Sequence, residues 1–220
     1  MSDLEYRQEI VETARELVKR GYLSSTGGNI SIRFKGENKL AITPSDFDYN
    51  LMMPQDICIM SLETDAIETP HKPSVETSLH AAIYQVRPDV QAIIHTHQVF
   101  PSALALLNKP IPALFDEQVR FLGRSVKVIP YMPSGTPLLK NIVRKNVQDQ
   151  NNAYMMANHG ALIFGDTMLR AFHNVSVLEK CSIAYLLGIL SGEKVSTIPL
   201  AIREIAFSKL RKDQKKAEAE

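Results

Sequence analysis

The chain has 220 residues, of which 45% are hydrophobic and 22% charged, a composition that is typical of a globular domain and excludes a disordered one. Lys and Arg number 25 against 24 Asp and Glu, so the net charge of +1 argues against proteins that bind nucleic acid or a membrane surface, which carry a basic excess. No apolar run approaches the roughly 20 residues that span a bilayer. The two cysteines, Cys58 and Cys181, lie in apolar segments. We therefore expect a single-domain cytoplasmic protein with buried thiols and no disulfide.

The first half of the chain predicts one helix followed by short strands. Ser2 and Glu5 have the spacing of a capping box, and an apolar stripe continues from there until Gly21 stops the helix. Alternating apolar and polar residues then predict strands at 29–33, 39–42 and 56–60, and a helix over 75–86.

The second half continues the mixture of strands and helices. The expected strands are 90–95, 126–129, 153–157 and 161–164, and the expected helices are 102–107, 138–148 and a long one that Asp166 caps and that ends near Leu190. Residues 209–220 are rich in Lys, Glu, Gln and Ala and are expected to form a solvated or frayed polar tail. The sum is one α/β or α+β domain over residues 1–208, in which helices cover a sheet that is not purely parallel.

The histidines gather in places where they could share an ion. His95 and His97 end an apolar strand, and residues two apart in a strand point to the same side, so both imidazoles can reach one cation. His159 lies in a tight turn after another apolar strand and could present a third imidazole. Three nitrogen ligands with one open position are typical of a catalytic metal. The alternatives are polar residues at the rim of a sheet for the pair, and ordinary turn chemistry for Asn158-His159-Gly160.

Two further features could serve such a site. Glu76 opens the helix 75–86, where the helix dipole favours an ionised carboxylate, and His80 lies one turn later on the same face. A glutamate is also common at this place in helices that have no function. The segment 24–29, Ser-Ser-Thr-Gly-Gly-Asn, could turn successive N–H groups toward an anion, with hydroxyls from Thr43, Ser45 and Ser74 added. A plain glycine turn into a strand explains the segment equally well.

Taken together and in this order, the motifs resemble the class II aldolase/adducin family. They are Ser-Thr-Gly-Gly-Asn-Ile-Ser at 25–31, Thr43-Pro44-Ser45, Pro73-Ser74-Val75-Glu76 with His80, His95-Thr96-His97 and Asn158-His159-Gly160. The likeness covers the chain from the first helix to the long last one and is strongest to the sugar-phosphate aldolases of the family. It implies a three-layer α/β/α sandwich around a mostly antiparallel sheet, assembled as a homotetramer with active sites between subunits.

The resemblance also implies roles for individual residues. His95, His97 and His159 would hold Zn²⁺, or another divalent ion such as Mn²⁺, Co²⁺ or Fe²⁺, and Glu76 matches the acid–base carboxylate that also ligates the metal when substrate is absent. The phosphate-binding groups of the family map onto Thr26, Gly28, Asn29, Thr43 and Ser74. The implied reaction is metal-dependent cleavage of a phosphorylated ketose into a dihydroxyacetone-type ketone and an aldehyde, through an enediolate that the metal stabilises.

Three departures from the family pattern bear on the substrate. Val75 replaces a second serine after Ser74. Asp46 replaces a glycine, and its carboxylate would repel a phosphate if it faced the site. Asp116 and Glu117 stand where the first tyrosine of the family is expected, and no tyrosine follows Tyr185, so the group that protonates the leaving aldehyde is unassigned.

The same site chemistry leaves other reactions open. Decarboxylation of a 3-keto sugar acid passes through the same enediolate, and dehydration of a ketose phosphate is a third possibility. The epimerases of the family carry Asp where this chain has Glu76, which favours cleavage over epimerisation. A non-catalytic, adducin-like interaction module would lack the histidine ligands, which this chain has. We therefore expect a lyase acting on a sugar or sugar phosphate, with no nucleic-acid or membrane partner.

Overall fold

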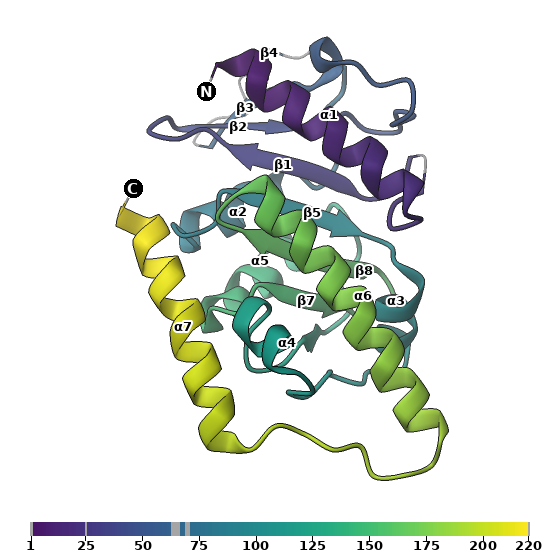
Figure 1. Ribbon diagram of the computed structural model, residues 1–220. Helices are drawn as coiled ribbons and strands as arrows, with labels where there is room; N and C mark the ends of the chain where they lie inside the picture. The colour runs from purple at the N-terminus through teal and green to yellow at the C-terminus, as the bar shows by residue number, and fades with distance from the viewer. Residues whose placement is uncertain (1, 25, 63–66, 69–70, 220) are drawn as a thin grey trace.

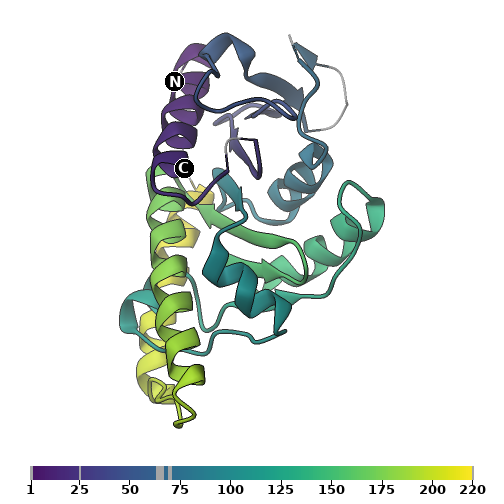
Figure 2. The same ribbon diagram turned by 90° about the vertical axis from the view of Figure 1, so that its right-hand side faces the viewer.

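One mixed sheet runs through the protein, and helices cover both of its faces (Figure 1, Figure 2). The structure is a computed structural model that describes residues 2–24, 26–62, 67–68 and 71–219. Within these residues the sheet has eight strands in the order β4-β3-β2-β1-β5-β8-β7-β6. In chain order the strands are β1 Asn29–Arg33, β2 Lys39–Ile42, β3 Cys58–Ser61, β4 Ile67–Glu68, β5 Ala92–Thr96, β6 Lys127–Ile129, β7 Ala153–Met156 and β8 Gly160–Gly165.

The helices form a layer on each face of this sheet. Helices α1 (Asp3–Lys19) and α6 (Met168–Leu190) lie side by side on one face, and α2 (Thr77–Val86) and α5 (Pro137–Asn146) cover the other (Figure 1). Helix α3 (Val99–Leu106) packs in the α1–α6 layer, and α4 (Asp116–Phe121) packs against α6 and α7 (Leu200–Ala219). None of the helices that the structure describes has the length and apolarity needed to cross a membrane. The expected α/β/α sandwich is confirmed.

Alternation along the central strands builds one hydrophobic core on each side of the sheet. Ile94 and Ile163 pack with α1 and α6, whereas their sequence neighbours Ile93 and Phe164 pack with α2 and α5. Each described pair of neighbouring strands is antiparallel except β6–β7, which confirms the mostly antiparallel sheet. Because His95 is two residues after Ile93, its ring faces the side of the sheet that α2 covers.

Helices α1 and α6 each begin at a side-chain cap. The capping box of α1 is confirmed, because the Glu5 N–H donates to Ser2 Oγ and the Ser2 N–H donates to Glu5 Oε2. The cap of α6 is Thr167 and not Asp166 as expected: the Arg170 N–H donates to Thr167 Oγ1 at 3.1 Å. Either residue type can accept this bond, so composition alone could not separate two adjacent candidates.

The C-terminal segment is a docked helix. We expected residues 209–220 to be a solvated or frayed tail, but α7 continues to Ala219. Its Phe207 and Leu210 are buried against Ala113 and Val119 in a small separate hydrophobic cluster. Lys, Glu, Gln and Ala are strong helix formers, so the composition that suggested solvation also suits a helix with one buried edge.

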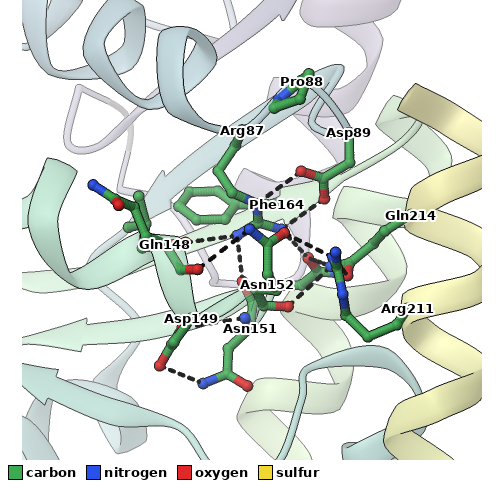
Figure 3. Close-up of polar contacts among 12 residues, drawn as sticks. Arg87, Pro88, Asp89, Gln148, Asp149, Asn151, Asn152, Phe164, Arg211 and Gln214 are labelled. Atoms are coloured by element: carbon green, nitrogen blue, oxygen red, sulfur yellow. Dashed lines mark hydrogen bonds and ion pairs between the residues drawn. The ribbon is translucent and has the colours of Figure 1, made fainter. Parts of the chain in front are cut away.

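A buried arginine joins this last helix to the end of α2 (Figure 3). Arg87, fully buried, donates through Nε and Nη2 to both carboxylate oxygens of Asp89, at 2.8 and 2.7 Å. Its remaining donors bind the carbonyl oxygens of Val147 and Asn151 and the side-chain oxygen of Asn152. The same Asn152 oxygen accepts a hydrogen bond from Gln214 of α7 at 2.9 Å. One guanidinium with all five donors satisfied therefore ties α2, the strand β7 region and α7 together.

Removing this arginine should be costly. The substitution Arg87→Met leaves the Asp89 carboxylate buried without its partner, and we expect the free energy of unfolding to fall by about 3–5 kcal/mol. Urea unfolding followed by circular dichroism measures the loss. The matched double variant Arg87→Met/Asp89→Asn removes the stranded charge and should recover part of the stability; a single variant that loses less than about 1 kcal/mol would contradict the ion pair's structural role.

Candidate functional site

Three histidines converge at the end of β5. His95 lies in β5 and His97 follows it, while His159 lies in the turn that joins β7 to β8. Because β8 pairs with β5, the turn is carried to the end of the histidine strand. The ligand atoms of the three rings all lie within 4.8 Å of one another. His95 Nε2 and His97 Nε2 are 3.0 Å apart, close to the roughly 3.3 Å that two nitrogen ligands of one tetrahedral Zn²⁺ would show.

Gly160 permits this close approach. A Cβ atom at this position would lie 2.7 Å from His97 Cδ2 and 2.3 Å from the Thr96 carbonyl oxygen. A side chain at position 160 would therefore push the β8 backbone away from the rings of His95 and His97. Gly28 does the same on the other neighbour of β5: its φ is +80°, and a Cβ there would lie 2.4 Å from the His95 carbonyl oxygen.

The orientation of His95 is set by a backbone hydrogen bond. His95 Nδ1 lies 2.9 Å from the carbonyl oxygen of Ala161, which can only accept. A ring that carries a single proton therefore holds it on Nδ1, and its Nε2 lone pair then faces the centre of the cluster. Burial lowers the pKa of His97 to about 4 and also lowers that of His159. Both rings are accordingly neutral at pH 7, which is the form that binds a metal.

The carboxylate of Glu76 closes the open side of the cluster. Its Oε2 lies 3.4 Å from His95 Nε2 and its Oε1 lies 3.3 Å from His159 Nε2. Asn29 Nδ2 donates to Oε2 at 2.9 Å, and Ser134 Oγ donates to Oε1 at 3.0 Å. Burial raises the pKa of Glu76, but the neighbouring histidines and the Asn29 hydrogen bond outweigh it and lower the pKa to about 2. Glu76 is ionised at neutral pH.

These contacts fit a divalent cation. With a single ring proton on His95 Nδ1, His95 Nε2 and the Glu76 carboxylate are two acceptors that face each other at 3.4 Å. Two acceptors at this distance repel each other, and a cation placed between them turns the repulsion into ligation. Imidazole nitrogens with one carboxylate oxygen are a donor set that suits Zn²⁺ and its first-row neighbours.

The residues expected to bind phosphate lie partly together. The Ser74 N–H donates to the Thr43 carbonyl oxygen at 3.2 Å, and both side chains are buried. Asn29 is in the adjacent strand, but its amide group is engaged with Glu76. Gly28 precedes Asn29, and Thr26 is exposed in the loop before it. The structure thus brings Thr43, Ser74 and Asn29 near one another and assigns Asn29 a contact that the sequence did not predict.

Asp46 occupies a backbone conformation that favours glycine. Its φ is +54°, in the left-handed region, and its side chain is exposed and accepts a hydrogen bond from Ser45 Oγ at 3.4 Å. The family's glycine at this position has a physical reason, because a residue without Cβ adopts this φ at no cost. Aspartate is one of the few other residues that tolerates it.

Ser134 was not predicted from the sequence. It lies in the loop before α5 and donates a hydrogen bond to the Glu76 carboxylate. The Pro-Ser-Gly-Thr segment at 133–136 was the only sequence signal near Ser134, and it indicated a turn.

Asp116 and Glu117, which stand where the family has a tyrosine, lie in α4, and Glu117 pairs with Lys180 of α6 at 2.8 Å. The loop that reaches Glu76 also carries Tyr131, whose side chain is 55% exposed.

Comparisons with known proteins agree with this geometry. The sequence profile of the class II aldolase and adducin N-terminal domain matches residues 8–186. The chain is 32% identical over 179 residues to 5-deoxy-D-ribulose 1-phosphate aldolase of Bacillus thuringiensis serovar kurstaki, covering 81% of this chain and 83% of that protein. It is 29% identical over 200 residues to 3-oxo-tetronate 4-phosphate decarboxylase of Haemophilus influenzae, covering 89% and 92%. A solved L-fuculose 1-phosphate aldolase superposes with a TM-score of 0.88 at 31% identity, covering 94% and 96%.

Loss of one histidine should empty the cluster of metal. We expect His95→Ala to remain folded but to lose bound metal, because two imidazoles and Glu76 cannot replace its nitrogen. Elemental analysis after dialysis measures metal per chain, and circular dichroism checks the fold. His71→Ala is the matched control, since His71 pairs with Asp56 away from the cluster. Full metal content in His95→Ala would contradict the assignment.

Proposed function

Because this chain belongs to the class II aldolase and adducin family and is a lyase of that family, we propose that it cleaves a ketose 1-phosphate into a dihydroxyacetone-type ketone and an aldehyde. The observation that carries the proposal is the placement of Glu76, whose two carboxylate oxygens face His95 and His159. A metal-dependent aldolase needs an electrophile and a proton-transferring group near one carbon: the three histidines would hold a cation as the electrophile, and Glu76 lies beside them as the proton-transferring group.

A divalent cation held by His95, His97 and His159 would supply Lewis acidity toward the substrate oxygens on which negative charge builds as the carbon–carbon bond breaks. Three neutral imidazoles leave the full positive charge of the cation available for that purpose. We propose Zn²⁺ as this cation, supported by the nitrogen-rich donor set; Mn²⁺, Co²⁺ or Fe²⁺ would fit the same ligands.

Glu76 is proposed as the acid–base group. Its carboxylate is ionised, buried and held by Asn29 on one oxygen and Ser134 on the other. When the two substrate oxygens take its place in the cluster, the carboxylate stays within reach of the carbon from which the bond breaks. There the ionised carboxylate can take up the proton released from the hydroxyl that becomes the aldehyde and pass it to this carbon, which leaves as part of the ketone; in the reverse direction it removes that proton.

The phosphate of the substrate is proposed to bind to Thr26, Gly28, Asn29, Thr43 and Ser74, of which Asn29, Thr43 and Ser74 lie near one another. Ser74 lies three residues before the start of α2, and its hydroxyl accepts a hydrogen bond from the N–H of Glu76, the N-cap residue, at 3.3 Å. The dipole of this helix favours an anion near its start, and hydroxyl and N–H donors can hold a phosphate where several converge. The exposed, left-handed Asp46 is engaged with Ser45, which supports a carboxylate that points away from this pocket.

Decarboxylation of a 3-keto sugar acid phosphate is the second candidate. It is favoured by the similarity to 3-oxo-tetronate 4-phosphate decarboxylase along 92% of that protein. Both reactions place negative charge on the same pair of oxygens, so one site serves either. Incubating the metal-loaded protein with ketose 1-phosphates and with 3-keto acid phosphates separates them: release of an aldehyde supports the aldolase, and release of carbon dioxide alone overturns it.

Assembly and location are part of the proposal. We propose a homotetramer with sites between subunits, supported by large apolar side chains that the single chain leaves exposed, namely Leu51, Val99, Leu169, Leu187 and Leu190. We propose a cytoplasmic location, supported by two free and buried cysteines, Cys58 and Cys181.

Replacing the Glu76 carboxylate by an uncharged amide should abolish most of the turnover without abolishing metal binding. Glu76→Gln keeps the shape of the side chain and the histidine ligands, so the variant should still take up metal. Its kcat should fall by roughly 10²–10⁴-fold, because the amide cannot exchange the proton. Steady-state kinetics on metal-loaded protein measure the loss. Near-normal turnover of the metal-loaded variant would show that another group carries the proton.

Anions should compete for the phosphate pocket. Inorganic phosphate or phosphoglycolate should inhibit competitively, and Ser74→Ala should weaken that inhibition by roughly tenfold, the value of one hydrogen bond to a charged group. Asp46→Gly should leave it unchanged if the carboxylate points away and tighten it if the carboxylate faces the pocket. If neither anion competes and an unphosphorylated sugar turns over equally well, the phosphate site is wrong.

A further inference from the structure

A row of polar contacts joins α2 to β1 and ends at Glu76. Asn29 Nδ2 donates to Glu76 Oε2 at 2.9 Å. One step along both elements, Ser31 Oγ lies 2.7 Å from His80 Nδ1, and the same hydroxyl lies 2.8 Å from Tyr84 Oη. Ser31 and His80 are fully buried. These contacts are therefore shielded from water and from competing partners.

The spacing of the two elements matches along this row. Glu76 is the N-cap residue of α2, and His80 and Tyr84 follow at intervals of four residues, which place them on one face of the helix; four helical residues rise about 6 Å. Asn29 and Ser31 are two residues apart on one face of β1, where two residues rise about 6.6–6.8 Å. Because the two rises nearly agree, the helix and the strand meet at successive side chains, and a rotation of α2 about its axis would break the Glu76 and His80 contacts together.

The hydrogen bonds of the row have a defined direction. Tyr84 Oη donates to the carbonyl oxygen of Gln91 at 3.4 Å, and a carbonyl can only accept. Ser31 can then donate to Tyr84, and His80 Nδ1 donates to Ser31. Burial lowers the pKa of His80 to about 3, so the ring is neutral and carries the single proton that this arrangement requires. His80 Nε2 has no partner within the described part of the chain and is left with its lone pair.

The row also lies beside β5, the strand that carries His95. In the sheet, Asn29 is directly opposite His95, and Ser31 is opposite Ile93. The strand that positions α2 is thus the same strand that pairs with β5. Any shift of α2 along or around β1 would change the position of Glu76 relative to His95 and His159, while the three histidines kept theirs.

We propose that His80 is a positioning residue: through its hydrogen bond to Ser31 it sets the rotation of α2 on β1, so that the Glu76 carboxylate faces His95 and His159. The inference rests on the role proposed above for Glu76. His80 itself touches neither substrate nor the cluster in this account. Its effect is on where the carboxylate lies, and a displacement of about 1 Å can cost on the order of 10²-fold in rate.

Kinetics of four variants test this role. His80→Leu and Ser31→Ala each remove the bond, and both should lower kcat by about 10–100-fold with KM changed less than about threefold. His80→Asn, whose side-chain amide nitrogen can take the place of Nδ1, should recover kcat to within about threefold of the parent. Ser182→Ala is the matched control, because Ser182 is a buried serine whose hydroxyl bond to Leu178, in α6, is equally lost. It should leave kcat unchanged.

A spectroscopic readout makes the test independent of the reaction. With Co²⁺ as the probe, the visible absorption responds to the kind and number of ligands, so Glu76→Gln defines the spectrum without the carboxylate. His80→Leu and Ser31→Ala should move the spectrum of the parent toward that of Glu76→Gln, and His80→Asn should restore it. If His80→Leu does not fold, Ser31→Ala answers the same question.

The outcomes separate the two proposals. Parental kcat and a parental Co²⁺ spectrum in both His80→Leu and Ser31→Ala would overturn the positioning role and leave the aldolase proposal intact. If the parent protein cleaves no ketose phosphate, the aldolase proposal fails, and the Co²⁺ spectra alone then decide whether His80 places Glu76.

Discussion

The contact between the Glu76 carboxylate and the His95 imidazole is the constraint on which the rest of the site depends. Both groups are buried, and when the single ring proton of His95 is on Nδ1 and donates to the Ala161 carbonyl, two acceptors face each other. Such an arrangement is stable only with positive charge between the two groups. Strand pairing, the glycines at 28 and 160 and the start of α2 can all be understood as the structure that holds this contact in place.

The histidines of the cluster and Glu76 differ in charge and therefore in the role each can take. Burial keeps His97 and His159 neutral, so the cluster has lone pairs to offer at neutral pH. Glu76 brings the single negative charge among these groups, and two side chains from different parts of the chain, Asn29 and Ser134, hold it by one oxygen each. A carboxylate held in this way can leave the cluster when substrate oxygens arrive and still remain beside them, as acid–base catalysis at an adjacent carbon requires.

Much of this arrangement could be predicted from the sequence, because its signals are local. The capping box of α1 depends on neighbours in the chain and is confirmed. The spacing of His95 and His97 is also local, and their rings do lie close together. Ser134 reaches Glu76 across 58 positions, and the docking of α7 depends on Gln214 meeting Asn152, 62 positions away. Such contacts are set by tertiary packing and leave no periodic pattern in the sequence. For this reason the polar segment 209–220 was expected to be a tail, although most of it belongs to the packed helix α7.

The most direct measurement of the central claim is X-ray absorption spectroscopy of the Zn²⁺-loaded protein without substrate. We predict three imidazole nitrogens and one carboxylate oxygen around the metal, at about 2.0–2.2 Å, with the carboxylate absent from Glu76→Gln. A sulfur ligand, fewer than three imidazoles, or a spectrum that Glu76→Gln does not change would contradict it.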